Sequence, residues 1–201
     1  MRLYLLILLL LFSVESPSNV LVKSEHSVPV GMAELNTFKK TCGNKCSFTG
    51  YINVNKLHFS EDVESGAFLL VRSEGGTKSF SVGIKANEDD KSAELVVMFN
   101  DGKNNSDSIV LAKSSLNAWE GFLLSWHDKE LLIENLRSVK KIGLNNTPYS
   151  QIEKSGITYQ TTLTFSPDHI AYMFMGSDAE MWIEMKNQNY NSSWKERYDK
   201  N

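Results

Sequence analysis

Histidine and serine side chains are the groups of this chain that could carry out catalytic chemistry. The four histidines are His26, His58, His127 and His169, and they are scattered with no paired spacing. A Ser-His-Asp set follows no fixed sequence order, but the chain has no Gly-x-Ser-x-Gly turn of the kind that presents a nucleophilic serine. We interpret each histidine as a surface or turn residue, so the sequence predicts no catalytic residue.

Two acidic clusters offer oxygen ligands that could bind calcium. Glu61, Asp62 and Glu64 form the first cluster, and residues 88–90 form the second. Neither has the alternate-residue spacing and internal glycine of a calcium loop. We read both as solvated loops, and the sequence predicts no metal and no cofactor.

Cys42 and Cys46 are the only cysteines. In an oxidising compartment, two cysteines this close most simply form a disulfide with each other. A metal site would need two more ligands at matching spacing, and a redox role would favour Cys-x-x-Cys spacing, which is absent. We predict the Cys42–Cys46 disulfide.

The first residues have the pattern of a secretory signal peptide. Met1 and Arg2 precede an apolar run over residues 3–12, and small residues follow at Ser16 and Ser18. The run is shorter than the roughly 20 apolar residues that cross a bilayer. We predict a signal peptide over residues 1–18 and a secreted, extracellular protein, with no later apolar run long enough to span a membrane.

The net charge and the glycosylation sequons are consistent with an extracellular protein. The formal net charge of -3 leaves no basic excess to neutralise phosphates, so nucleic acid is not an expected partner. Asn104, Asn145 and Asn191 each begin an Asn-x-Ser/Thr sequon in a polar, turn-like stretch. We predict these three asparagines as the glycosylation sites and expect two of them to be occupied.

Period-two alternation is the main structural pattern of the mature chain. Residues 79–85 alternate apolar and polar side chains, and residues 67–71 and 95–99 are apolar runs typical of strands buried on both faces. Turn residues at 100–102 and near Asp128 predict hairpins. With no convincing amphipathic helix to serve as a crossover, the pattern predicts an all-β fold, a single antiparallel β-sandwich or jelly roll.

We expect a lead-in segment with a small disulfide loop at residues 19–46, the sandwich at 47–185 and a polar C-terminal tail at 186–201. Alternation predicts the following core: Phe68, Leu70, Val82, Ile84, Val96, Leu124, Trp126, Leu132, Phe174 and Trp182.

Trp119 differs from the tryptophans that lie inside apolar strands. It follows Asn117 and Ala118 at a predicted strand entrance. Exposed aromatic rings beside Asn, Asp and Arg can stack on a sugar while the polar groups bind its hydroxyls. Trp119 and Arg72 are therefore the predicted ligand-binding residues.

The predicted hairpin and the last strand resemble one known family. Residues 122–128 read Phe-Leu-Leu-Ser-Trp-His-Asp, and Gly176 stands six residues before Trp182. These motifs resemble the farnesoic acid O-methyltransferase-like domain, which occurs in secreted invertebrate proteins. The resemblance covers about residues 50–185 and implies a β-sandwich, while the family name implies methyl transfer. Lys85 to Asp90 depart from the Gly-Gly-x-x-Asn-x-x-Ser stretch usual in that family.

Methyl transfer is not favoured by the residues themselves. A methyltransferase that binds its nucleotide cofactor in the conventional way uses a glycine-rich turn between a parallel strand and a helix. The one glycine pair, Gly75-Gly76, stands between two predicted strands as a hairpin turn. We therefore predict a non-enzymatic extracellular binding module whose ligand is a glycan or another extracellular protein. A farnesoic acid O-methyltransferase-type enzyme and a secreted salivary, venom or host-directed effector are the alternatives, and the oligomeric state stays open.

Overall fold

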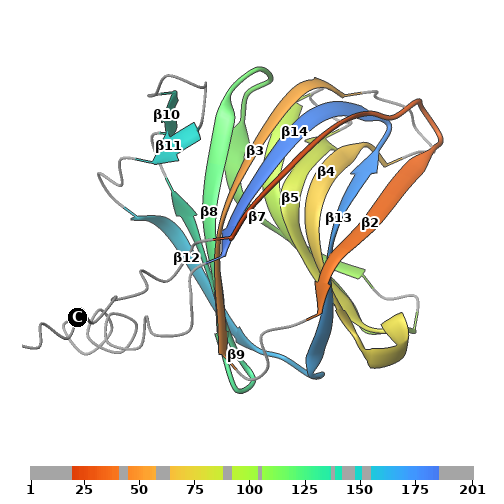
Figure 1. Cartoon of the computed structure of the whole chain (residues 1–201), viewed down its shortest axis with the longest axis vertical. Coiled ribbons are helices and arrows are strands. Elements are labelled where there is room, and N and C mark those ends of the chain that lie inside the picture. Colours follow the sequence, from red (N-terminus) through yellow and green to blue (C-terminus); the bar gives the residue numbers. More distant parts are fainter. Residues whose placement is uncertain are drawn as a thin grey trace, which may run out of the picture.

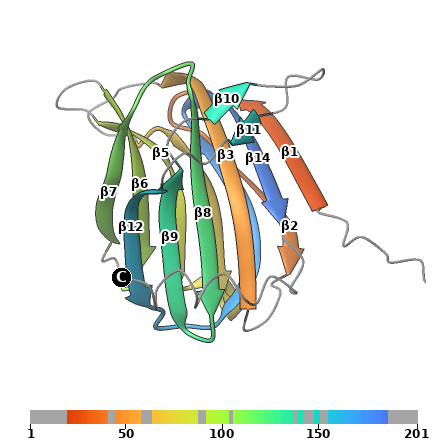
Figure 2. The same cartoon turned by 90° about the vertical axis from the view of Figure 1, so that its left-hand side faces the viewer.

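The computed structural model describes residues 20–40, 45–57, 64–87, 92–103, 106–136, 139–141, 148–150 and 155–185. Nearly all of these residues belong to strands of two six-stranded sheets that pack face to face (Figures 1 and 2). The described part of the chain has no helix long and apolar enough to cross a membrane. The predicted all-β sandwich is confirmed.

Sheet A is the first layer of the sandwich. Its order is β1 (Val20–Ser27), β14 (Ser177–Met185), β3 (Lys45–Leu57), β8 (Trp119–His127), β9 (Glu130–Leu136) and β12 (Ser155–Thr162). Every neighbouring pair is antiparallel. A short antiparallel pair, β10 (Val139–Lys141) and β11 (Pro148–Ser150), lies beside sheet A, where β10 contacts β8 (Figure 2).

Sheet B is the second layer. Its order is β2 (Ala33–Lys40), β13 (Pro167–Met175), β4 (Gly66–Ser73), β5 (Ser79–Asn87), β6 (Ser92–Asn100) and β7 (Ser106–Ser114). All of its neighbouring pairs are also antiparallel. Strands β1 to β4 alternate between the two sheets along the chain, and so do β12 to β14.

The sandwich begins earlier than the sequence predicted. Residues 19–46 were expected to be a lead-in, but β1 pairs with β14 and β2 pairs with β13 along eight and seven residue pairs. These are the two edge strands on the same side of the sandwich. On β1 the positions that share a face with the inward Val22 include the polar residues Ser24 and His26, which explains why this strand shows no sustained apolar alternation.

Local turn chemistry explains the hairpins. Asp128 has a φ of 54° between β8 and β9, and Gly102 has a φ of 80° between β6 and β7. The Gly102 amide donates to Asn100 Oδ1 at 2.8 Å, which closes that turn. Gly75 and Gly76, both with positive φ, lie in the single 3-10 turn η1 (Glu74–Gly76) between β4 and β5. All three hairpins were predicted from these residues.

The inward side chains of both sheets form one apolar core. Five members of the predicted core lie there: Val82, Ile84, Leu124, Trp126 and Phe174. The ring of Trp126 contacts Phe48 of sheet A and Phe80 of sheet B, with centroid distances of 5.6 and 6.4 Å. Trp126 therefore joins the two sheets.

The other five predicted core residues point away from this core. On β4 the inward residues are Leu69 and Val71, which places Phe68 and Leu70 on the outer face of sheet B. Val96, Leu132 and Trp182 lie on outer faces in the same way, each between two inward neighbours. Their strands are apolar on both faces, as predicted for residues 67–71 and 95–99, so the sequence pattern cannot reveal which residues point inward.

Candidate functional site

The outer face of sheet A carries three aromatic side chains close together. We call Tyr51 on β3, Trp119 on β8 and Trp182 on β14 the outer tryptophan cluster. Tyr51 pairs with Trp182 across β3 and β14, and Trp119 begins β8 opposite Asn53 of β3. Relative exposures of 6%, 9% and 7% show that the three rings are buried outside the main core.

A tight turn sets the position of Trp119. Asn117 has a φ of 61°, and its amide donates to the carbonyl of Val54 at 2.8 Å. Asparagine tolerates this left-handed conformation better than most residues. The turn delivers Trp119 to the start of β8, which confirms the predicted strand entrance. The expected exposure of its ring is wrong, because neighbouring rings cover it.

The cluster has defined ring geometry and a charged rim. The rings of Trp119 and Trp182 meet edge to face, with centroids 6.5 Å apart. Lys23 Nζ lies 4.9 Å from the centroid of the Trp182 ring and 3.0 Å from Glu180 Oε1. The same Glu180 oxygen accepts a hydrogen bond from Trp182 Nε1 at 2.6 Å. Lys23 and Glu180 thus form the polar border of the aromatic cluster.

Among the described residues of this face, three buried side-chain atoms have no hydrogen-bond partner. They are Trp119 Nε1, Asn53 Oδ1 and Ser125 Oγ. A buried polar atom without a partner costs about 1–3 kcal/mol and calls for an explanation. Trp119 supplies a donor and Asn53 an acceptor, and the two residues are direct partners across β8 and β3.

Arg72 and Trp119, the two predicted ligand-binding residues, are not brought together. Arg72 lies on the outer face of sheet B, next to Ser79 and His169 of the adjacent strands. Its guanidinium group lies against Gly76, where an added Cβ would clash with it. The structure therefore places Arg72 against the η1 turn, away from the outer face of sheet A.

The predicted covalent sites fall mostly outside the described residues. Cys46 is buried opposite Trp126, but Cys42 lies outside the described range. Asn104, Asn145 and Asn191 also lie outside it, as do the predicted signal peptide and the polar tail. The Cys42–Cys46 disulfide, the glycans and secretion therefore stay predictions.

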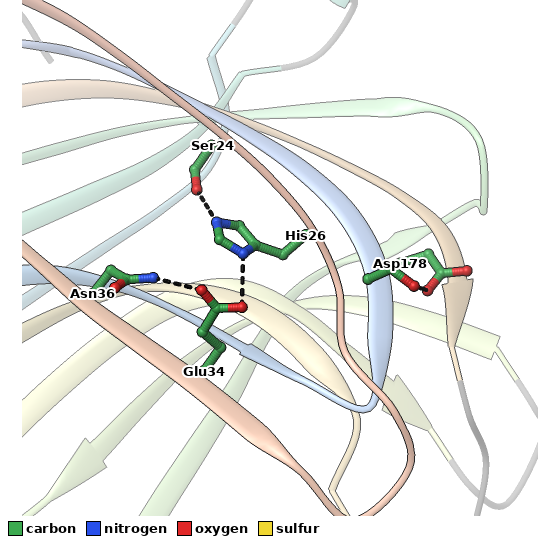
Figure 3. Close-up of polar contacts among 6 residues, drawn as sticks. Ser24, His26, Glu34, Asn36 and Asp178 are labelled. Atoms are coloured by element: carbon green, nitrogen blue, oxygen red, sulfur yellow. Dashed lines mark hydrogen bonds and ion pairs between the residues drawn. The ribbon is translucent and has the colours of Figure 1, made fainter.

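A second polar constellation joins the two edge strands (Figure 3). We call Ser24 and His26 of β1 together with Glu34 and Asn36 of β2 the edge relay. His26 Nε2 lies 2.6 Å from Ser24 Oγ, and His26 Nδ1 lies 2.7 Å from Glu34 Oε2. Asn36 Nδ2 donates to the other carboxylate oxygen of Glu34 at 2.8 Å. The hydrogen bond from Asn36 is the main cause that lowers the pKa of Glu34, and His26 adds to it.

Sequence reasoning missed the edge relay. The sequence feature that could have revealed it is a pair of i, i+2 motifs, Ser-x-His and Glu-x-Asn, on two strands joined by a tight turn. Residues two apart share one face of a strand, but residues 19–46 were not predicted as strands. The relay residues were therefore not expected to face one another.

Glu120, beside Trp119, points to the opposite face of β8. Burial raises the pKa of its carboxyl group, and a hydrogen bond from Ser114 Oγ at 3.2 Å offsets part of this effect. A pKa raised by folding means that ionisation of Glu120 opposes folding. Its contribution to stability is present below the unfolded pKa and is lost as the pH rises through the folded value.

Replacing Glu120 with glutamine is therefore expected to raise the melting temperature at pH 7. Glutamine stays neutral at every pH and can still accept the bond from Ser114. Below the ordinary carboxyl value of 4.5 the gain should disappear, because Glu120 is then protonated in both states. Thermal unfolding, followed by circular dichroism at pH 7 and at a pH below 4.5, tests this prediction. The exposed Glu25→Gln serves as the control. A lower melting temperature for E120Q at pH 7 would contradict the assignment.

Fold and site together define an antiparallel β-sandwich of the jelly-roll type with an aromatic cluster outside its core. No family model matches the chain, and no curated protein matches it. Similarity is found among solved structures. Xylan β-1,4-xylosidase from Bacillus halodurans matches at 10% identity over 86% of this chain and 33% of the enzyme, with a TM-score of 0.52.

Two further structures extend the comparison. The GH43B protein of a Bacteroides ovatus xyloglucan locus shares 9% identity over 86% of this chain and 33% of its own, with a TM-score of 0.50. Galectin-Ib from Xenopus laevis shares 6% identity over 75% of this chain and 99% of its own, with a TM-score of 0.45. The chain spans about a third of the length of the two bacterial proteins. At these identities the likeness shows the fold alone.

Proposed function

We propose that this protein is a secreted binding module that holds a glycan at the outer tryptophan cluster. The observation that carries the proposal is that Trp119 Nε1, a buried donor, and Asn53 Oδ1, a buried acceptor, both lack a partner on residues that face each other across β8 and β3. A sugar hydroxyl donates one hydrogen bond and accepts others. Sugar hydroxyls can therefore satisfy both kinds of atom once the side chains that cover them move aside.

The aromatic rings provide an apolar surface on which a sugar ring can stack. The apolar face of a pyranose packs on an indole ring while the ring edges stay hydrogen-bonded. Lys23, whose side chain is 49% exposed, covers the face of the Trp182 ring. An exposed cation–π contact and an exposed ion pair are each worth about 1 kcal/mol or less. Moving Lys23 off the ring is therefore a small cost compared with stacking a sugar on it.

Methyl transfer is less well supported by the structure. Gly75 and Gly76 lie in the η1 turn between two antiparallel strands, where no helix N-terminus follows to hold a nucleotide phosphate. Among the described residues, no group of three or more His, Cys, Asp and Glu side chains could hold a metal ion. The resemblance to the farnesoic acid O-methyltransferase-like domain stays a prediction about ancestry.

Replacing Asn53 with alanine is expected to weaken glycan binding by about 3- to 10-fold, the value of one neutral hydrogen bond. It should not lower stability through hydrogen bonding, because Asn53 Oδ1 has no partner to lose. A glycan array on the mature protein would identify the ligand, and titration calorimetry with that glycan would compare the variants. Thermal unfolding would be measured in parallel.

Asn87→Ala is the matched control, since Asn87 carries the same amide on β5 of sheet B. It should bind like the wild type. Equal binding by the Asn53→Ala and Asn87→Ala variants would show that the site lies elsewhere. An array without any bound glycan, for a folded and soluble protein, would reject the ligand class.

A further inference from the structure

The edge relay has the order of groups that activates a hydroxyl nucleophile. The two nitrogens of the His26 ring have different partners, Ser24 Oγ on one side and Glu34 Oε2 on the other. A serine, an imidazole base and a carboxylate linked in this order define the geometry of nucleophilic catalysis on many unrelated folds. The relay is recognised by this geometry, since its sequence order matches no motif.

The hydrogen-bond pattern determines which way the protons point. A carboxylate can only accept, so the Nδ1 nitrogen of His26 must carry a proton and donate it to Glu34. In the neutral ring, Nε2 then has a free lone pair, and the Ser24 hydroxyl donates to it at 2.6 Å. Asn36 donates to the second oxygen of Glu34 and so fixes the carboxylate. The ring is thus poised to take the proton of Ser24.

Packing holds the relay in one arrangement. Strand β1 is paired to β14 from Val20 to Ser27, and β2 to β13 from Ala33 to Lys40 with one bulge. The tight turn between β1 and β2 is closed by the Met32 amide donating to Pro29 at 3.1 Å. The His26 ring packs 4.8 Å from the centroid of Phe174. A base held between a packed strand and an aromatic ring is preorganised for proton transfer.

The relay joins β1 and β2, which are edge strands of the two sheets. The side chains of His26 and Glu34 are 22% and 44% exposed. Ser24 is more deeply placed at 6% exposure, so a reagent must be narrow or extended to reach Oγ. Ser27, on the same strand, bonds to Asp178 without an intervening imidazole and provides an internal comparison.

We propose that Ser24 is a nucleophile, activated by His26 and oriented by Glu34, that accepts an acyl group from small esters at the open edge of the sandwich. Ser24 Oγ forms a bond to the acyl carbon as its proton passes to His26 Nε2. The ester C–O bond breaks, and His26 returns the proton to the departing alcohol oxygen. Water then attacks the acyl-serine, gives a proton to His26 and releases the acid, and Ser24 regains its proton.

A fluorophosphonate probe tests this proposal on the full mature protein. Attack by Ser24 would form an O–P bond, break the P–F bond and release fluoride, with the serine proton passing to His26. Trypsin cleavage after Lys23 and Lys39 yields a peptide of residues 24–39 that contains both Ser24 and Ser27. Fragmentation of that peptide assigns the modified serine. We expect the label on Ser24.

Variants separate the roles of the relay residues. Ser24→Ala should abolish labelling, and Ser27→Ala should leave its rate unchanged. His26→Gln should slow labelling by about 100-fold or more, the usual effect of losing a general base. Glu34 acts through His26 as a positioning residue, so Glu34→Gln should slow labelling and Glu34→Asp should restore part of the rate.

The wild-type peptide map decides the proposal even where a variant fails to fold. Absence of label under conditions that modify a known serine hydrolase would overturn it, and so would a label on Ser27. Asn87→Ala, on β5 of sheet B, should be labelled at the wild-type rate. The edge relay and the outer tryptophan cluster share no residue, so glycan binding by Asn53→Ala and labelling of Ser24→Ala test the two proposals independently.

Discussion

Replacing Gly50 with alanine is expected to destabilise the protein by about 3 kcal/mol, although the change adds one methyl group. Gly50 of β3 pairs with Phe122 of β8, and the phenyl ring covers the glycine. A Cβ on Gly50 would lie 2.1 Å from Phe122 Cζ and 2.6 Å from both Cε atoms. Phe122 is fully buried, so its ring has no free space to enter. Urea unfolding monitored by fluorescence measures the loss.

A double-mutant cycle separates this clash from a general effect of alanine on the strand. Phe122→Ala alone should cost about 3–5 kcal/mol, since it empties a buried site. With the ring gone, the added methyl group has room, so the double variant should be clearly more stable than the sum of the two losses predicts. Simple additivity, or a cost below about 1 kcal/mol for Gly50→Ala, would show that the ring and the glycine do not interact as described.

Fold class and hairpins were predictable because local chemistry determines them. Asp128, Asn100 and the Gly75-Gly76 pair each adopt turn conformations that their residue types favour. Alternation over residues 79–85 placed Val82 and Ile84 inward correctly. These features depend on neighbours a few residues apart, which the sequence displays directly.

The candidate site was predicted only in part, because its members come from distant strands. Trp119 was chosen for its polar surroundings, and the structure puts it opposite Asn53, some 66 residues earlier in the chain. Trp182 was assigned to the core, since it lies in an apolar strand. It belongs to the outer cluster because its neighbours Met181 and Ile183 point inward. Such pairing depends on register between strands, which one sequence does not reveal.

The edge relay, near the start of the chain, was also not predictable from the sequence alone. His26 and Glu34 come together because β1 and β2 are the edge strands of the two sheets on the same side of the sandwich. Residues 19–46 have no strong alternation, so no residue pattern predicts strands there. Their pairing depends on β14 and β13, whose paired residues follow about 130 residues or more later. Tertiary contacts therefore decide this part of the fold.

Strand β4 offers the sharpest test of side-chain direction. The sequence predicted Phe68 and Leu70 as core residues, whereas the structure points Leu69 into the core and Leu70 to the outer face. The outward Phe68 is still fully buried, because Gly83 and Gly66 leave space beside its ring. Both faces of this strand are therefore covered near Phe68, whereas Leu70 and Arg72 are partly exposed.

Replacing Leu69 with aspartate is expected to cost about 5 kcal/mol or more, which is most of the stability of a typical domain. The change removes a fully buried side chain, worth about 1.5–3 kcal/mol, and adds an unpaired carboxylate to an apolar core, which costs several kcal/mol more. Leu70→Asp is the matched control, with an expected cost of about 1 kcal/mol because the carboxylate reaches solvent. Chemical denaturation of both variants gives the comparison. A larger loss for Leu70→Asp than for Leu69→Asp would mean that β4 faces the other way, and the inward residues of the adjacent strands β5 and β13 would then need reassignment too.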